Sequence, residues 1–214
     1  MKKVLFRYSL YIILLGAILT EMIYPLVGKG VHKTLGNIVL GAIVLHNLYN
    51  YRWYVRLFKG PYTAKRTIMA IVNSGMILAF LGMGIIIFLS PKLFGGGLDK
   101  MGLRIIHQEF AYWFYFLVCI HIGLHVPTFI ALGKVKFPQL YTGIGRSLGV
   151  LIWMLLLGTG VYAGIEIPWL QLLFTSPYSF PVYLDMSLMK AIVLHLGFSS
   201  LLITFGYVLV AKLK

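Results

Sequence analysis

Four of the six histidines form two pairs with the same spacing along the chain. His32 and His46 are 14 residues apart, as are His107 and His121, and each pair lies in an apolar stretch of helical length. On an α-helix this step brings both side chains to nearly one face, about 21 Å apart along the axis. Haem iron takes two axial ligands from opposite faces, and neutral imidazole suits it. Two such helices side by side therefore predict two stacked haems, each held by two histidines.

The remaining histidines leave alternatives open. His125 follows His121 by one turn and could replace it, although the 18-residue step from His107 rises about 27 Å and does not match the first pair. A hydrogen bond from His125 to a haem propionate is the favoured interpretation. His195 could replace His32, bind a quinone or pack in the core. Histidines within a membrane also serve as packed groups or proton relays, and His32 could be an ordinary interfacial residue.

The composition is that of an integral membrane protein. The chain has 214 residues, of which 60% are hydrophobic and 11% charged, and its mean hydropathy is +0.90. A soluble domain of this size could not hide so much apolar surface. A formal net charge of +14 would suggest nucleic acid in a soluble protein, but membrane topology accounts for it here, and we expect no nucleic-acid partner. The single cysteine, Cys119, excludes disulfides and covalently attached haem.

Six apolar stretches are long enough to cross about 30 Å of hydrocarbon. They cover about 8–27, 31–51, 67–89, 103–129, 148–165 and 188–209, and segments rich in proline or glycine separate them. The first stretch has the basic start of a signal peptide but no cleavage site, so we expect it to be retained. The prediction is an all-α fold, with one transmembrane domain over 1–214 and six helices that form a haem-binding bundle.

The positive-inside rule predicts a multi-pass protein of the cell membrane with both termini in the cytoplasm. Most of the 19 Lys and Arg residues fall on that side, whereas all five acidic residues fall on the other. The acids are Glu21, Asp99, Glu109, Glu166 and Asp185. The second and fourth stretches then both run inwards. This direction places His32 and His107 near the outer surface, and His46 and His121 near the inner surface.

Other features suit this site without requiring it. Arg104 near the outer pair and Arg52 near the inner pair could neutralise haem propionates. Segment 165–186 is too interrupted to span the membrane and too apolar to be freely solvated. It predicts a re-entrant or interfacial segment that covers a quinone cleft or docks a partner, or else a plain lid over the bundle.

Sequence motifs surround both histidine pairs. They read V-H-K-T-L-G-N and L-H-N-L-Y-N-Y-R-W-Y-V-R-L-F-K-G-P-Y around the first pair, and H-Q-E-F-A-Y-W and H-I-G-L-H around the second. Over about 31–126 the chain resembles a family of small prokaryotic di-haem membrane cytochromes b. This family is similar to the ferric-reductase-like cytochromes b and often accompanies extracytoplasmic, flavin-bearing electron carriers. The resemblance implies two haem b groups and, as iron ligands, His32, His46, His107 and His121 (or His125).

The predicted function is electron transfer across the membrane through two bis-histidine b haems. The sequence predicts no flavin or nicotinamide domain, so we expect electrons to enter from a quinol such as menaquinol or from a separate subunit. The expected acceptor is an extracytoplasmic flavoprotein or another redox carrier. One alternative is a quinone-reactive anchor subunit of a larger oxidoreductase. Another is a transporter with a histidine proton relay, which predicts inverted repeats and broken mid-membrane helices.

Overall fold

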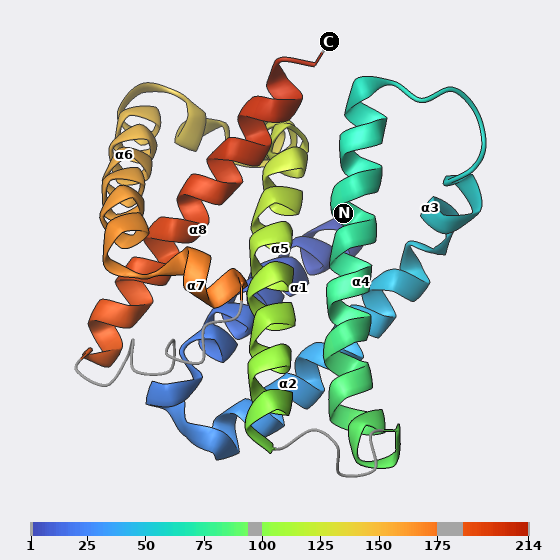
Figure 1. Ribbon diagram of the computed structural model, residues 1–214. Helices are drawn as coiled ribbons and strands as arrows, with labels where there is room; N and C mark the ends of the chain where they lie inside the picture. Colours follow the sequence, from blue (N-terminus) through green and yellow to red (C-terminus); the bar gives the residue numbers. More distant parts are fainter. Residues whose placement is uncertain (1, 94–99, 175–185, 214) are drawn as a thin grey trace. The chain divides into compact units, whose positions relative to one another are not determined.

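The computed structural model of the chain is built from α-helices (Figure 1). It describes residues 2–93, 100–174 and 186–213, and these ranges contain no strand, so the all-α prediction is confirmed for them. The long helices are α1 (Lys2–Met22), α2 (Tyr24–Tyr49), α4 (Ala64–Leu93), α5 (Lys100–Lys136), α6 (Gly143–Glu166) and α8 (Leu188–Ala211). The short ones are α3 (Tyr51–Arg56), the 3-10 turn η1 (Pro138–Tyr141) and α7 (Trp169–Leu173).

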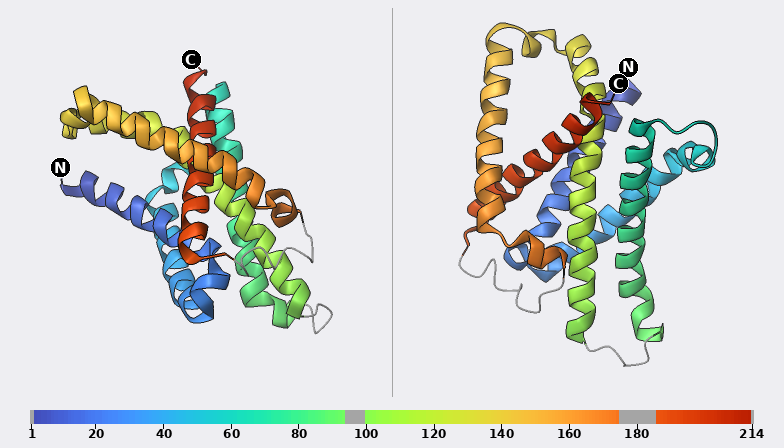
Figure 2. Two further views of the ribbon diagram at one scale, coloured as in Figure 1. Left: turned by 90° about the vertical axis from the view of Figure 1, so that its left-hand side faces the viewer. Right: turned by 45° about the horizontal axis from the view of Figure 1, so that its top comes forward.

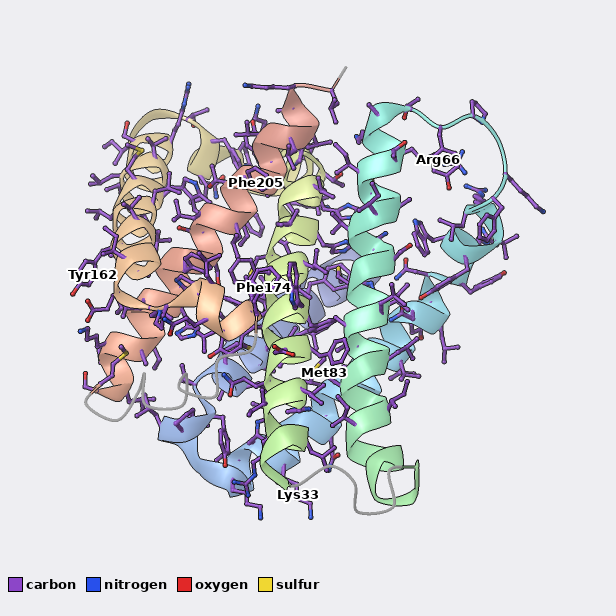
Figure 3. The ribbon with its side chains drawn as sticks, in the orientation of Figure 1. Lys33, Arg66, Met83, Tyr162, Phe174 and Phe205 are labelled. Carbon is purple, nitrogen blue, oxygen red and sulfur yellow. The ribbon has the colours of Figure 1, made fainter. Side chains whose placement is uncertain are left out.

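Four of the described helices are long and apolar enough to cross a membrane. They are α4 over Ala64–Ile86, α5 over Gly102–Lys136, α6 over Gly143–Glu166 and α8 over Leu188–Ala211. In α6 most apolar side chains are exposed; Ile152, Met154 and Leu155 are 57%, 61% and 63% exposed. Tyr162 likewise points away from α8 (Figure 3). Such an apolar surface suits contact with membrane lipid, because a helix satisfies its own backbone polar groups there.

The first two predicted spans are helical but are not among these four. In α1 the described apolar segment is the shorter Tyr11–Met22. The second stretch lies in α2, where His32, Lys33 and His46 interrupt the apolar residues. The structure therefore supports four membrane-crossing helices in its described part. The total of six membrane-spanning helices stays a prediction.

The proline- and glycine-rich segment between the first two predicted spans contains Pro25, Gly28 and Gly30, and it is a kink inside a helix and not a loop. Proline occupies the first turn of α2, where its missing N–H would have no helical partner in any case. Gly28 has φ 83° and ψ 163°, a conformation that glycine adopts without the steric cost of a Cβ. Because the kink precedes His32, the step from His32 to His46 lies on one uninterrupted helical segment.

The chain divides into two compact units. Unit 1 comprises Met1–Pro61 with Tyr183–Ile192, and unit 2 comprises Tyr62–Val182 with Val193–Lys214. Within unit 1, α1 packs against α2. Within unit 2, α4 and α5 lie side by side, and α8 crosses both α5 and α6 (Figures 1 and 2). The single bundle over 1–214 stays a prediction.

Glycines allow the helices of unit 2 to approach closely. A Cβ on Gly123 of α5 would lie 2.9 Å from the Cα of Gly206 in α8. A Cβ on Gly197 of α8 would lie 2.7 Å from the backbone nitrogen of Gly160 in α6. Lipid tails are as apolar as the helices, so membrane helices associate through close packing of this kind. The two crossings fix α5 and α6 against α8.

Candidate functional site

His32 of α2 is held by two residues at the end of α1 and the start of α2. Its Nδ1 pairs with the carboxylate oxygen Oε2 of Glu21. The ring of Tyr24 lies 4.8 Å from the imidazole, centroid to centroid. The Glu21 side chain is 15% exposed, and its other oxygen, Oε1, is buried without a hydrogen-bond partner among the described residues. A carboxylate directed at Nδ1 is the usual companion of a metal-binding histidine.

His46 lies at the other end of the same helical segment. Tyr11 of α1 approaches its ring edge-on at 5.5 Å. The amide nitrogen of Asn50 lies 3.4 Å from the His46 Nε2, but its shorter bond, 2.8 Å, goes to the His46 carbonyl oxygen. Iron binding through Nε2 would displace only the longer of these two contacts. The His46 ring is therefore compatible with ligation.

The polar groups after His46 close the end of α2. The amide nitrogen of Asn47 donates to the carbonyl oxygen of Ile43 at 2.8 Å, and Tyr54 of α3 donates its hydroxyl to the Asn47 side-chain oxygen. Burial raises the pKa of Tyr54, which keeps the phenol protonated as a donor. These bonds anchor α3 to α2 beside the exposed Arg52.

His121 of α5 is oriented by a neighbouring helix. Its Nδ1 lies 2.8 Å from the side-chain oxygen of Asn73 in α4. An amide oxygen can only accept, so Nδ1 carries the proton and Nε2 carries the lone pair. This tautomer presents Nε2 for metal binding, and the bond to Asn73 fixes the direction of the ring.

His107 and His125 lie on α5 with His121, one toward each end. The rings of His121 and His125 are 4.7 Å apart, edge to face. The structure therefore brings both candidates for the inner ligand together. The hydrogen bond from His121 to Asn73 favours His121 as ligand, and His125 is then placed beside it for the propionate role. His107 is half-buried, and Arg104 is exposed less than one turn before it.

Two positions between the histidines are buried in both histidine helices. In α2 they are Val39 and Ile43, which are seven and eleven residues after the first histidine. In α5, Phe114 and Val118 are buried at these two offsets, and other faces of the helix bury Tyr112, Tyr115 and Cys119. Side chains at these offsets share the histidine face of a helix. In both helices, the face that carries the histidines is thus a buried face.

His195 lies in a packed aromatic cluster of unit 2. It is 1% exposed, and its ring lies 5.6 Å from Trp169 and 6.1 Å from Tyr115. Its carbonyl oxygen accepts hydrogen bonds from Tyr115 at 3.1 Å and Ser199 at 2.7 Å. Trp169 in turn stacks on Phe198 at 3.8 Å. These contacts favour core packing for His195 over the ligand and quinone interpretations.

The first part of segment 165–186 is buried and helical in part. Ile167 and Trp169 are buried, and the indole of Trp113 on α5 donates to the carbonyl oxygen of Leu173 at 3.1 Å. Phe174, at the end of α7, lies 5.4 Å from Trp113 beside α5 (Figure 3). The rest of the segment up to Asp185 lies outside the described residues, as does Asp99. The re-entrant cover over a quinone cleft stays a prediction.

Asn73 is not among the site residues predicted from the sequence, and Glu21 was predicted only to lie on the outer side. Each could have been found by its isolation: Asn73 is the one side-chain amide in 67–89, and Glu21 is the one acid in its apolar stretch. A polar group placed alone in such a segment needs a partner. In the structure, that partner is a histidine in both cases.

The partners of the histidines are compatible with haem. Among the described residues, no group of three or more His, Cys, Asp or Glu is placed to hold an ion. A bis-histidine haem requires only one histidine from each of two helices. The oxygen acceptors at Nδ1 of His32 and His121 fit iron-bound imidazoles, and so does the buried, unsatisfied oxygen of Glu21.

No family model matches this chain, and no curated protein or solved structure matches it significantly.

Proposed function

We propose that this protein is a membrane cytochrome b that binds two haem b groups and transfers electrons across the membrane. The observation that carries the proposal is that one histidine of each proposed haem site has an oxygen partner at its Nδ1. The partner of His32 is Glu21, and the partner of His121 is Asn73. Both histidines lie on helices with the same 14-residue histidine step and the same buried offsets. Bound haem would supply a one-electron carrier at each position.

In this proposal α1 and α2 are the first two of six spans, and the N-terminus is cytoplasmic. Alternating crossings then make α2 and α5 parallel. His32 and His107 bind the outer iron, and His46 and His121 bind the inner one. Val39 and Phe114 are buried midway between the histidines of their helices, about 10 Å along the axis from each.

The continuity of the helices favours electron transfer over transport. A transporter with a histidine relay was expected to show broken mid-membrane helices. In the described residues α4, α6 and α8 are uninterrupted, α5 continues through Pro127, and the one non-helical residue of α2, Gly28, lies near its start. An anchor subunit of a larger oxidoreductase would use the same haem sites with electrons moving in the opposite direction.

The purified protein should contain two non-covalent b haems per chain. Both should be low-spin, because histidines fill both axial positions, and carbon monoxide should leave the reduced spectrum unchanged. Acid–acetone extraction followed by haem quantification per polypeptide gives the stoichiometry, and the reduced α-band gives the ligation. A folded protein that stays colourless when expressed with ample haem would overturn the proposal.

Electrons should enter from quinol or a partner subunit and leave on the extracytoplasmic side. The cytoplasmic segments 52–66 and 134–146 are short and basic, without the glycine pattern of a nucleotide or flavin site. Oriented vesicles given a menaquinol analogue and an impermeant external acceptor should show haem reduction followed by reduction of the acceptor. If a cytosolic nicotinamide-linked partner reduces the haems and quinol does not, the quinol version is wrong.

A further inference from the structure

The two oriented histidines differ in the chemistry of their Nδ1 partners. His32 faces the carboxylate of Glu21, whereas His121 faces the neutral amide oxygen of Asn73. A carboxylate paired with Nδ1 stabilises positive charge on the imidazole more than a neutral amide oxygen does. The pairing therefore makes Nε2 a stronger electron donor to iron. The two sites are therefore electronically unequal.

The surroundings of Glu21 leave its charge poorly screened. One oxygen pairs with His32, the other is buried, and the structure shows no Lys or Arg paired with this carboxylate among the described residues. Its Oε2 also lies against Gly36, one turn after His32, where an added Cβ would be 3.8 Å away. A mostly buried carboxylate without a compensating charge is costly. Positive charge that develops at the His32 ring or its ligated iron would compensate it.

We propose that Glu21 is a positioning residue that lowers the reduction potential of the haem bound by His32 below that of the haem bound by His121. The proposal rests on the two haem sites proposed above. The carboxylate stabilises the ferric state, because that state carries one more positive charge near His32. The outer haem thereby becomes the stronger reductant of the two. This assigns α1 a functional side chain in addition to its packing against α2.

The test is a redox titration of the haem-loaded full chain at one pH. Glu21→Gln keeps the shape of the side chain and removes its charge. We expect both haems to stay bound and the potential of one to rise, with about a tenfold change in its reduction equilibrium, or about 59 mV for one electron. Glu166→Gln, which removes an exposed carboxylate at the end of α6, should change neither potential.

Two further variants separate charge from structure. Glu21→Asp keeps the charge. The potential of the His32 haem should therefore lie closer to its value in the unmodified chain in Glu21→Asp than in Glu21→Gln. Asn73→Asp gives His121 a carboxylate partner and should lower the potential of the other haem. A His46→Ala background retains only the His32 haem. In this background Glu21→Gln should still raise the potential of that haem, and Asn73→Asp should leave it unchanged.

The outcomes distinguish this inference from the function on which it rests. Two bound haems whose potentials do not respond to Glu21→Gln would refute the role of Glu21 and leave the cytochrome intact. Equal shifts in Glu21→Asp and Glu21→Gln would also refute it, because the charge would then not be the cause. An unmodified chain that binds no haem would refute the proposed function instead.

Discussion

Replacing His121 with alanine removes one of the two haems and leaves the spectrum of the other in place. Each iron draws on its own pair of histidines, so the loss of one imidazole empties only that site. His125→Ala is the matched control, one turn away on the same helix, and should keep both haems with at most a shifted potential. Haem content per chain and the reduced α-band measure both effects.

The opposite result would reassign the inner ligand. If His125→Ala loses a haem and His121→Ala keeps both, His125 binds the iron. The hydrogen bond between His121 and Asn73 would then serve to pack α4 against α5. If either substitution removes both haems, the sites are not independent, and the model of two separate histidine pairs is wrong.

A leucine at Gly123 should strongly destabilise the contact between α5 and α8. The added Cβ would press on the carbonyl oxygen of Ile203 and lie 2.9 Å from the Cα of Gly206. These are backbone atoms, so no side-chain rotation can make room. Overpacking of this kind costs about 3 kcal/mol, which lowers the midpoint of thermal unfolding by about 10 °C in a chain of this size.

Gly158 of α6 offers a matched control, because nothing lies within 4 Å of the position that its Cβ would take. Gly158→Leu should change stability by less than about 0.5 kcal/mol. Thermal unfolding in detergent, followed by circular dichroism, compares the two variants directly. Equal melting temperatures would show that α5 and α8 do not cross at Gly123 and Gly206.

The sequence by itself determined the features that depend on local residues. Hydropathy located the helices, because a span must be apolar over its own length whatever lies beside it. The 14-residue histidine step was equally visible, since helical geometry fixes which residues share a face. The helix ends were less accurate: α5 continues past its predicted end at 129 to Lys136, because residues 130–132 extend the apolar run. The break at Gly28 became a kink, since neither Pro25 nor Gly28 needs a loop in its position.

Only the tertiary structure decided which side chains meet the histidines. Asn73 is 48 residues from His121 along the chain, and the hydrogen bond between them depends on how α4 and α5 rotate about their axes. Glu21 reaches His32 because α1 ends beside the kinked start of α2. His195 looked like a possible ligand in sequence, yet the crossing of α8 with α5 and the fold of α7 enclose it among aromatic rings. Such contacts join residues from different helices, so local patterns of hydropathy and spacing do not predict them.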